Sequence, residues 1–175
     1  MRLTEGERRI LEGSGGVAKA KSLKIIKALG GIYGADRLIP VESVQIAGVS
    51  YSNLLEPGLE YLQSLAVDGE AVVPAFLNPA GMDLLDYGKL GVDEEFASKQ
   101  MKVIDAFKMM GVTPTCTCTP YLIGVKPGVG SHIAWSESSA VTYANSVLGA
   151  RTNREGGPSA IASALTGLTA NYGLH

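Results

Sequence analysis

The chain has 175 residues, of which 46% are hydrophobic and 18% are charged. This length and composition allow one domain with a buried core and argue against an intrinsically disordered chain. The formal net charge is −2, so no basic surplus indicates binding to nucleic acid or to an anionic membrane surface. No apolar run has the length of a membrane span, and the polar, acidic N-terminus does not resemble a signal peptide.

Two helices are predicted at the start of the chain. Thr4 and Glu7 form a capping-box pattern, which favours a helix over 5–11. A second helix is predicted over 17–29, because apolar side chains recur there at helical spacing. The glycine pair at 30–31 is expected to end it, since glycine readily adopts the left-handed conformation that follows many helices.

Two short strands and a helix follow. Residues 44–48 form a strand-like run that stops at a glycine, and 71–75 form a second short apolar strand. Between them, the spacing of leucines predicts a helix over 57–65. Asn78 and Pro79 then mark a loop, because both residues favour turns.

The second half of the chain is predicted to be mainly helical. Asp93 can cap a long helix over 94–110. A further helix is predicted over 136–148, and a last one over 158–165, with Pro158 at a favoured first-turn position. The alternation of strands and helices predicts an α/β fold with a mixed or parallel sheet and flanking helices. No linker or repeat divides the chain.

Polar turns follow both of the predicted strands. Gly48, Val49 and Ser50 follow the first strand, and Asn78 and Pro79 follow the second. Ligands of α/β proteins collect beyond the carboxyl ends of parallel strands, where backbone N–H groups can hold an anionic oxygen. The turns therefore predict a pocket. A plain glycine turn, and an asparagine that bonds its own backbone, are the alternatives.

Both cysteines lie in the segment 115–121, where a third strand is expected to end. Cys116 and Cys118 can supply one or two thiolate ligands to a soft metal. A pair of small buried apolar side chains is the alternative. Because the two are too close in sequence to form a disulfide framework, we expect a reducing, cytoplasmic location. This segment is the best candidate for the seat of chemistry.

The region after the cysteines offers further polar candidates. Glu137 can cap a helix or point into a site as an acid or hydrogen-bond acceptor. His132 is interpreted as a structural loop residue. Arg151, Asn153 and Arg154 lie between an apolar helix and a glycine pair. Such arginines suit a carboxylate or phosphate, and a solvated helix end is the alternative.

Taken together, these segments resemble the large subunit of the aconitase X family, and most closely its archaeal phosphomevalonate dehydratase branch. The segments that carry the resemblance are Gly48-Val49-Ser50, Asn78-Pro79, Thr117–Tyr121, Trp135–Ala140 and Ala144–Arg154. The last run is the longest and most specific match. The resemblance covers the whole chain, and it implies part of an aconitase-like catalytic domain.

The resemblance implies a two-subunit hydro-lyase that removes water from (R)-5-phosphomevalonate to give trans-anhydromevalonate 5-phosphate. It implies a [4Fe–4S] cluster whose iron acts as a Lewis acid on the departing hydroxyl. In this family the large subunit carries three cluster cysteines, and a serine on a separate small subunit acts as the base. The expected partners are thus the small subunit and a phosphorylated hydroxy acid.

The family motifs also imply roles for particular residues. The residues implied in substrate binding are Gly48, Val49, Ser50, Asn78, Pro79, Glu137 and Ser138. Cys118 matches a cluster ligand, and Cys116 is expected to be its neighbour. The chain departs from the family in having neither of the other two cluster cysteines, and in having Ser139 where the family often has Asn. It covers less than half of the usual large subunit, so 1–175 is expected to be a single domain or its N-terminal part.

Two other functions fit the same sequence. One is a cis-3-hydroxy-L-proline dehydratase of the same family, whose substrate shares a hydroxyl beta to a carboxylate but carries a ring amine in place of a phosphate. The other is a non-catalytic piece that acts in binding or assembly, because the chain lacks a full set of cluster ligands.

Overall fold

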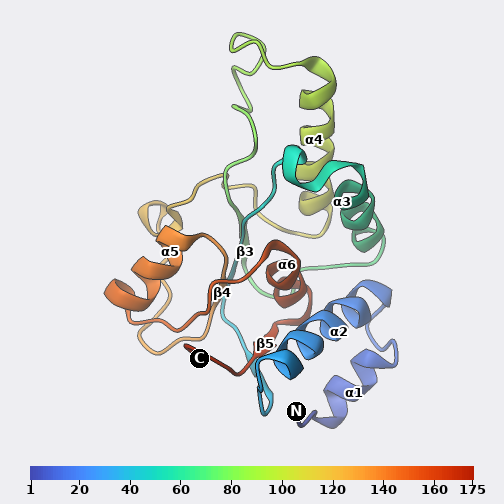
Figure 1. Cartoon of the computed structure of the whole chain (residues 1–175), viewed down its shortest axis with the longest axis vertical. Coiled ribbons are helices and arrows are strands. Elements are labelled where there is room, and N and C mark those ends of the chain that lie inside the picture. The colour runs from blue at the N-terminus through green and yellow to red at the C-terminus, as the bar shows by residue number, and fades with distance from the viewer.

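The computed structural model describes all residues from Met1 to His175. In chain order the elements are α1 (Glu5–Leu11), α2 (Val17–Ile32), β1 (Leu38–Pro40), β2 (Val44–Ile46), α3 (Tyr51–Ala66), β3 (Ala75–Leu77), α4 (Glu94–Met109), a 3-10 turn η1 (Pro120–Ile123), β4 (Ala134–Trp135), α5 (Ser138–Tyr143), a π-helical turn η2 (Ala144–Leu148), α6 (Gly157–Thr166) and β5 (Leu168–Ala170). Figure 1 shows short strands at the centre with helices around them.

The central sheet is parallel and has the strand order β3-β2-β4. Single parallel bridges extend it at both edges. Thr113 pairs with Phe76 beside β3, and Arg151 and Arg154 pair with His132 and Trp135 at the β4 edge. A separate antiparallel pair joins β1 to β5. The α/β class and the mixed strand directions are as the sequence predicts.

The two faces of the central sheet are covered by different helices. Side chains such as Val44, Ile46 and Leu77 pack against α3, α4 and α6 in the main core. Trp135 points to the other face, where a smaller cluster includes Ala140 and other residues of the α5 region. Because side chains alternate along a strand, the middle residue of β2, Gln45, points away from the main core.

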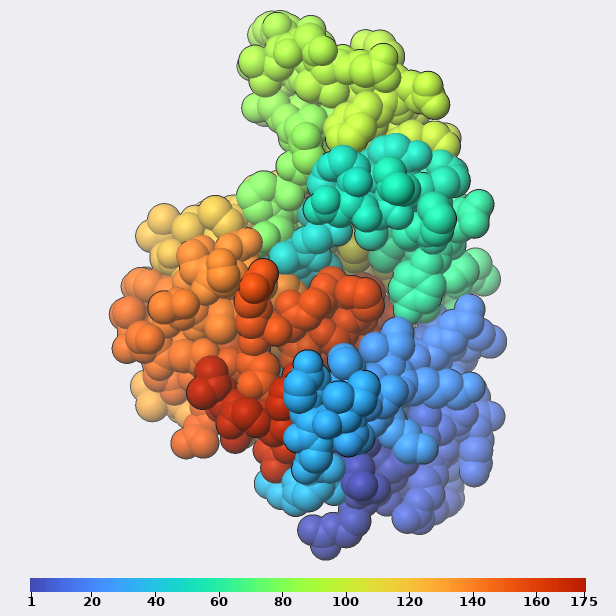
Figure 2. Space-filling model, in the orientation of Figure 1, coloured from blue at the N-terminus to red at the C-terminus, as the bar shows by residue number.

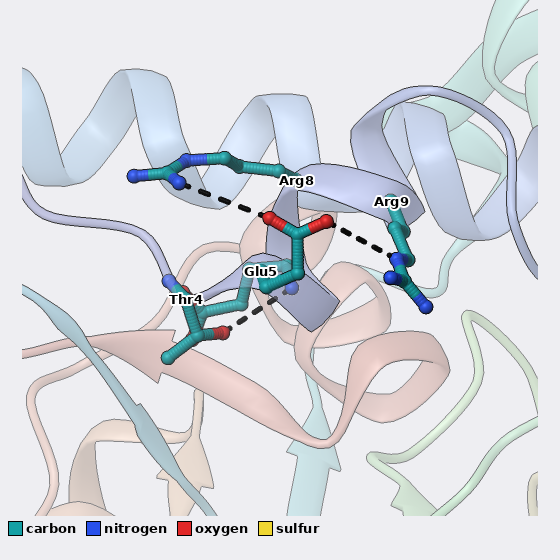
Figure 3. A network of polar contacts seen from close by, with 5 residues as sticks. Thr4, Glu5, Arg8 and Arg9 are labelled. Atoms are coloured by element: carbon teal, nitrogen blue, oxygen red, sulfur yellow. Dashed lines mark hydrogen bonds and ion pairs between the residues drawn. The ribbon is translucent and has the colours of Figure 1, made fainter.

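The N-terminal helices are fixed by local polar contacts and by burial against α6. At the start of α1, the Thr4 hydroxyl and the Glu7 carboxylate cap each other's backbone N–H groups, as predicted. Figure 3 shows Glu5 between Arg8 and Arg9, with N–O distances of 3.9 and 3.2 Å. These ion pairs are exposed, so each contributes less than about 1 kcal/mol.

The predicted end of the second helix at the glycine pair 30–31 is wrong, because α2 continues to Ile32. Gly30 is buried, and a Cβ atom there would lie 3.0 Å from the Ala170 side chain. This glycine therefore allows α2 to approach β5 closely and does not stop the helix.

The predicted strand over 71–75 is also misplaced, since β3 begins only at Ala75. The backbone N–H groups of Ala71 and Val72 donate to Met110 and Ala164 at the ends of α4 and α6. These two residues therefore bond to helix ends, and the pairing with β2 begins only at the Pro74 carbonyl.

The remaining helices match their predictions more closely. The helix predicted over 57–65 is the second part of α3, which is kinked at Leu55, where φ is 51°. Asp93 caps α4 as predicted, with its carboxylate accepting from the Phe96 N–H. The helix predicted over 136–148 begins later, at Ser138, and passes into the π-turn η2. The last predicted helix corresponds to α6.

The loop between β3 and α4 projects from the body of the molecule. Figure 2 shows this light-green segment standing above the rest of the surface. Leu85 and Leu90 on it are 91% and 68% exposed. Every helix falls short of the length and apolar character that crossing a bilayer requires.

Candidate functional site

Three polar side chains from the ends of three parallel strands meet in a closed ring of hydrogen bonds. Gln45 Nε2 on β2 donates to Oδ1 of Asn78, directly after β3, over 2.9 Å. Asn78 Nδ2 donates to Oε2 of Glu137, two residues after β4, over 2.8 Å. The Glu137 backbone N–H then donates to Gln45 Oε1 over 3.2 Å. The two sequence-predicted residues, Asn78 and Glu137, are thus in direct contact.

The Gln45 member of this ring is absent from the candidates drawn from the sequence. It is fully buried, and it interrupts the apolar run of β2. Buried polar side chains are almost always hydrogen-bonded, so a glutamine inside a short strand is a usable signal for a polar network. Asn78 bonds to this network through its side chain, and the alternative of a turn closed only on its own backbone is wrong.

The Glu137 carboxylate is held in its charged form. Partial burial opposes ionisation, but hydrogen bonds from Asn78, from the Ser138 hydroxyl and from the backbone of Ser139 and Ser138 outweigh it. The pKa of Glu137 therefore lies below its ordinary value. The same carboxylate caps α5, because it accepts from the Ser139 N–H over 3.5 Å. The interpretation of Glu137 as a helix cap is thus confirmed, and its role toward a ligand stays a prediction.

The turn after β2 presents backbone donors at the same edge of the sheet. Gly48 has a φ of 74°, a left-handed conformation that favours glycine. The N–H groups of Gly48, Val49 and Ser50 make no hydrogen bond within the chain. Val49 is 2% exposed and its side chain belongs to the core, so the more accessible donors of this turn are the N–H groups of Gly48 and Ser50. Consecutive free N–H groups at a strand end are suited to an anionic oxygen.

A second buried glutamine, Gln100 on α4, fixes this turn in place. Its Nε2 donates to the Val49 carbonyl over 2.9 Å. Its Oε1 accepts from the N–H groups of Tyr51 and Gly81, over 2.9 and 3.2 Å. One amide therefore ties together the loops that follow β2 and β3.

The cysteine segment runs along the end of β3. The Leu77 carbonyl accepts from the Thr115 hydroxyl over 2.9 Å and from the Thr117 N–H over 3.3 Å. Cys116 has a φ of 48°, uncommon for a residue with a side chain. Burial raises the pKa of its thiol, and a hydrogen bond involving the Ala80 backbone opposes that rise in part. Cys116 therefore lies against the loop that begins at Asn78.

Cys118 is a free, exposed cysteine, and Cys116 is half-buried and also free. The alternative of two buried apolar side chains is therefore wrong for Cys118. An accessible thiol suits an iron atom. No group of three or more histidine, cysteine, aspartate or glutamate side chains in the chain could hold a metal ion. The donor set thus fits one corner of an iron–sulfur cluster and cannot complete it.

The segment after Cys118 joins the cysteine loop to α5. The rings of Tyr121 and Tyr143 are stacked, with centroids 3.8 Å apart. Both line an open groove together with Ser138. The groove therefore places Ser138, a sequence-predicted residue, on the surface between the cysteine loop and the Glu137 side of the site.

The other candidates lie away from the ring. His132 precedes β4, at the opposite end of that strand, and its Nδ1 lies 3.1 Å from Nδ1 of His175. This agrees with a structural role. Arg151 and Arg154 are exposed and lie on the extended segment beside β4, so the alternative of a solvated helix end is wrong. Asn153 Nδ2 donates to the Tyr172 carbonyl over 3.0 Å.

Comparison with known proteins places this arrangement in one family. The model of the aconitase X first domain matches residues 1–175. The chain belongs to the aconitase X family. The crystal structure of Thermococcus kodakaraensis aconitase X in its holo-form superposes with a TM-score of 0.91 at 52% identity. That match covers 100% of this chain and 43% of the solved one.

Similar proteins with established names support the same family assignment. The phosphomevalonate dehydratase large subunits of Methanosarcina mazei and Methanocaldococcus jannaschii are 55% and 54% identical over 176 residues. Each match covers 100% of this aconitase X chain and 44% of the relative, so the chain spans less than half the length of these relatives. The cis-3-hydroxy-L-proline dehydratase of Hypocrea jecorina is more distant, at 36% identity over 99% of this chain and 29% of its own length.

Proposed function

We propose that this chain is the N-terminal part of the large subunit of a cytoplasmic phosphomevalonate dehydratase. The complete enzyme would dehydrate (R)-5-phosphomevalonate to trans-anhydromevalonate 5-phosphate, with a small subunit that supplies the base. The observation that carries the proposal is the match of the whole chain, at 53–55% identity, to four archaeal large subunits of that name. The matches to hydroxyproline dehydratases reach only 34–36%.

The geometry at the carboxyl edge of the sheet suits a substrate with both anionic and hydroxyl groups. The free N–H groups of Gly48, Val49 and Ser50 would hold an anionic oxygen of the substrate. The charged carboxylate of Glu137 would accept a hydrogen bond from a hydroxyl of the substrate. Asn78 and Pro79 would form the wall between them, and Ser138 would extend the pocket toward the groove at Tyr121.

Cys118 would hold one iron of a [4Fe–4S] cluster, with the remaining ligands outside these residues. When bound, the cluster would supply a Lewis acid for the departing hydroxyl. The role of this chain would be to position that thiolate beside the loop that carries Asn78, through the bonds of Thr115 and Thr117 to the Leu77 carbonyl.

The test is an assay of the full-length large subunit with the small subunit, after anaerobic loading with iron and sulfide. We expect phosphomevalonate to lose water, as measured by ¹H NMR. In a competition assay we expect the enzyme to prefer phosphomevalonate over cis-3-hydroxy-L-proline. Turnover of hydroxyproline alone would replace the proposed substrate with the alternative. No turnover of either substrate would support a binding or assembly role.

Two cysteine variants test the assignment of Cys118 as a cluster ligand. Cys118→Ser should abolish the absorbance of the cluster and the activity, because a hydroxyl is a poor ligand for this iron. Cys116→Ser is the matched control, and we expect it to keep the cluster. If the two variants exchange these outcomes, Cys116 is the ligand and the assignment of Cys118 is wrong.

A further inference from the structure

The buried amide of Gln45 is the one member of the hydrogen-bonded ring with no access to a ligand. Its exposure is 0%, and its neighbours in register on either side are Phe76 and Trp135. It cannot touch a substrate, yet both of its polar atoms contact residues of the proposed site. Any effect of Gln45 on the reaction must therefore pass through Asn78 and Glu137.

The direction of every bond in the ring follows from one fixed group. The backbone N–H of Glu137 can only donate, so the atom of Gln45 that faces it over 3.2 Å must be the oxygen. The nitrogen of Gln45 then faces Asn78 and makes Oδ1 its acceptor. This leaves the nitrogen of Asn78 pointing at the Glu137 carboxylate, where a donor is required.

The Glu137 carboxylate, which can only accept, already favours the observed orientation of the Asn78 amide, and the Gln45 Nε2 that donates to Asn78 Oδ1 adds a second constraint from the other side. A rotated Asn78 would place its oxygen against Glu137 Oε2, and two acceptors repel each other. The Glu137 carboxylate would then lose one of its donors and its fixed position. The arrangement seen here is the only one in which all three side chains are satisfied.

We propose that Gln45 is a positioning residue for the reaction, one that fixes the Asn78 amide from the side opposite Glu137 and thereby helps to hold the Glu137 carboxylate in place. The inference rests on the proposed function, because it assigns the ring to the substrate site. Residues that orient a functional side chain commonly change activity by about 10- to 100-fold when they are replaced.

The test is a double-mutant cycle in the holo complex of full-length large and small subunits. Gln45→Met removes both polar atoms at nearly constant volume, and we expect kcat/KM for phosphomevalonate to fall by about 10- to 100-fold. In the background of Asn78→Ala the same change should reduce kcat/KM less than about 3-fold, because the contact through Asn78 is already lost and only the bond from the Glu137 N–H to Gln45 Oε1 remains to be removed. Gln45→Glu, which still accepts but cannot donate, should be impaired like Gln45→Met, and it replaces that variant if the latter does not fold.

Ser43→Ala is the matched control. Ser43 is buried just before the same strand, and it accepts a hydrogen bond from Trp135 Nε1 over 3.2 Å without contacting the ring. Loss of the Ser43 hydroxyl should lower stability. Its effect on kcat/KM should be independent of Asn78, so the factors by which Ser43→Ala and Asn78→Ala each change kcat/KM should multiply in the double variant. If Gln45→Met behaves in this multiplicative way, Gln45 is only structural and the inference is overturned.

Failure of the proposed function is a separate result. If the unmutated complex dehydrates no substrate, the assignment of activity is wrong. The ring is then tested by urea unfolding of the unmutated protein, the Gln45→Met and Asn78→Ala variants, and the double variant. Non-additive changes for Gln45→Met and Asn78→Ala would support the coupled ring, and additive changes would overturn it.

Discussion

Glu137 and Glu155 both lie next to β4, and their pKa values are shifted in opposite directions. Glu137 follows the strand at its carboxyl edge and receives hydrogen bonds from an amide, a hydroxyl and backbone N–H groups. Glu155 lies beside the strand, with its N–H bonded to the Trp135 carbonyl over 2.9 Å. Its side chain is 6% exposed and has hydroxyl partners, with Thr169 Oγ1 at 3.2 Å.

The comparison shows that the donors around a carboxylate decide its charge as much as burial does. For Glu137 the donors prevail and the pKa is lowered. For Glu155 burial prevails over the hydrogen bonds from Ser159 and Thr169, and the pKa is raised. The first glutamate is kept charged at the candidate site, whereas the second is held closer to neutrality between α6 and β5.

The largest effect on activity is expected from Glu137→Gln. Glutamine keeps the size of the side chain and can still accept from Asn78, but it removes the charge. We expect kcat/KM of the holo complex to fall by about 100-fold, with some loss of stability near neutral pH because the hydrogen bonds around Glu137 favour its charged form. Glu155→Gln is the matched control and should keep most of the activity. Equal losses in the two variants would remove the distinction between them.

A smaller effect, on stability, is expected from Glu155→Gln. Because the folded-state pKa of Glu155 is raised above its ordinary value of 4.5, the folded state binds the proton more tightly than the unfolded chain. The stability from this group is therefore present at low pH and is lost as the pH rises through the folded pKa. We expect Glu155→Gln to raise the free energy of unfolding at pH 8 by on the order of 1 kcal/mol.

Urea unfolding across the pH range checks this expectation. The advantage of Glu155→Gln should shrink as the pH falls toward 4.5, the ordinary value for glutamate. Glu137→Gln should show the opposite trend, because its folded-state pKa is lowered. A gain for Glu155→Gln that is the same at every pH would mean that ionisation is not its cause.

The smallest effect is expected at the far end of β4, where His175 meets His132. Burial and the neighbouring His132 lower the pKa of His175 from 6.5 to about 4. The folded state therefore binds this proton less readily than the unfolded chain, so stability is full above pH 6.5 and declines as the pH falls toward 4. His175→Gln should flatten this decline by less than about 1 kcal/mol, because the side chain is only partly buried and solvent screens its interactions in part. Thermal melts at pH 7 and pH 5 measure the difference, and an unchanged pH dependence would assign the decline to other groups.

Much of the helical structure was predictable because its signals are local. The Thr4–Glu7 capping box and the Asp93 cap are present at the predicted positions. The strands β1, β4 and β5 were missed because two or three residues carry no periodicity. The equally short β2 was found because it lies in a longer apolar run that stops at Gly48. Gly30 was misinterpreted as a helix end because its contact with Ala170 joins segments far apart in the chain.

Part of the candidate site was also predictable, and for a physical reason. Turns that follow parallel strands gather at one edge of a sheet, so Ser50 and Asn78 could be expected near one another before the fold was known. Glu137 was linked to them only by the family resemblance, because the short strand β4 that precedes it was not predicted. Their roles toward a substrate stay predictions. The strand expected to end at the cysteine segment is wrong, since only Thr113 forms a single bridge with Phe76, but the segment does lie beside the end of β3 through the Leu77 carbonyl.

The sequence by itself determined the α/β class, the family motifs and the residue types at the strand ends, because these depend on local patterns. Only the tertiary structure decided that Gln45, Asn78 and Glu137 close a ring, and that Cys118 is exposed while Cys116 lies against the Asn78 loop. Hydrogen bonds between residues 33, 59 and 92 positions apart require the strands to be in register. That register is a property of the packed sheet and is not encoded in any single segment.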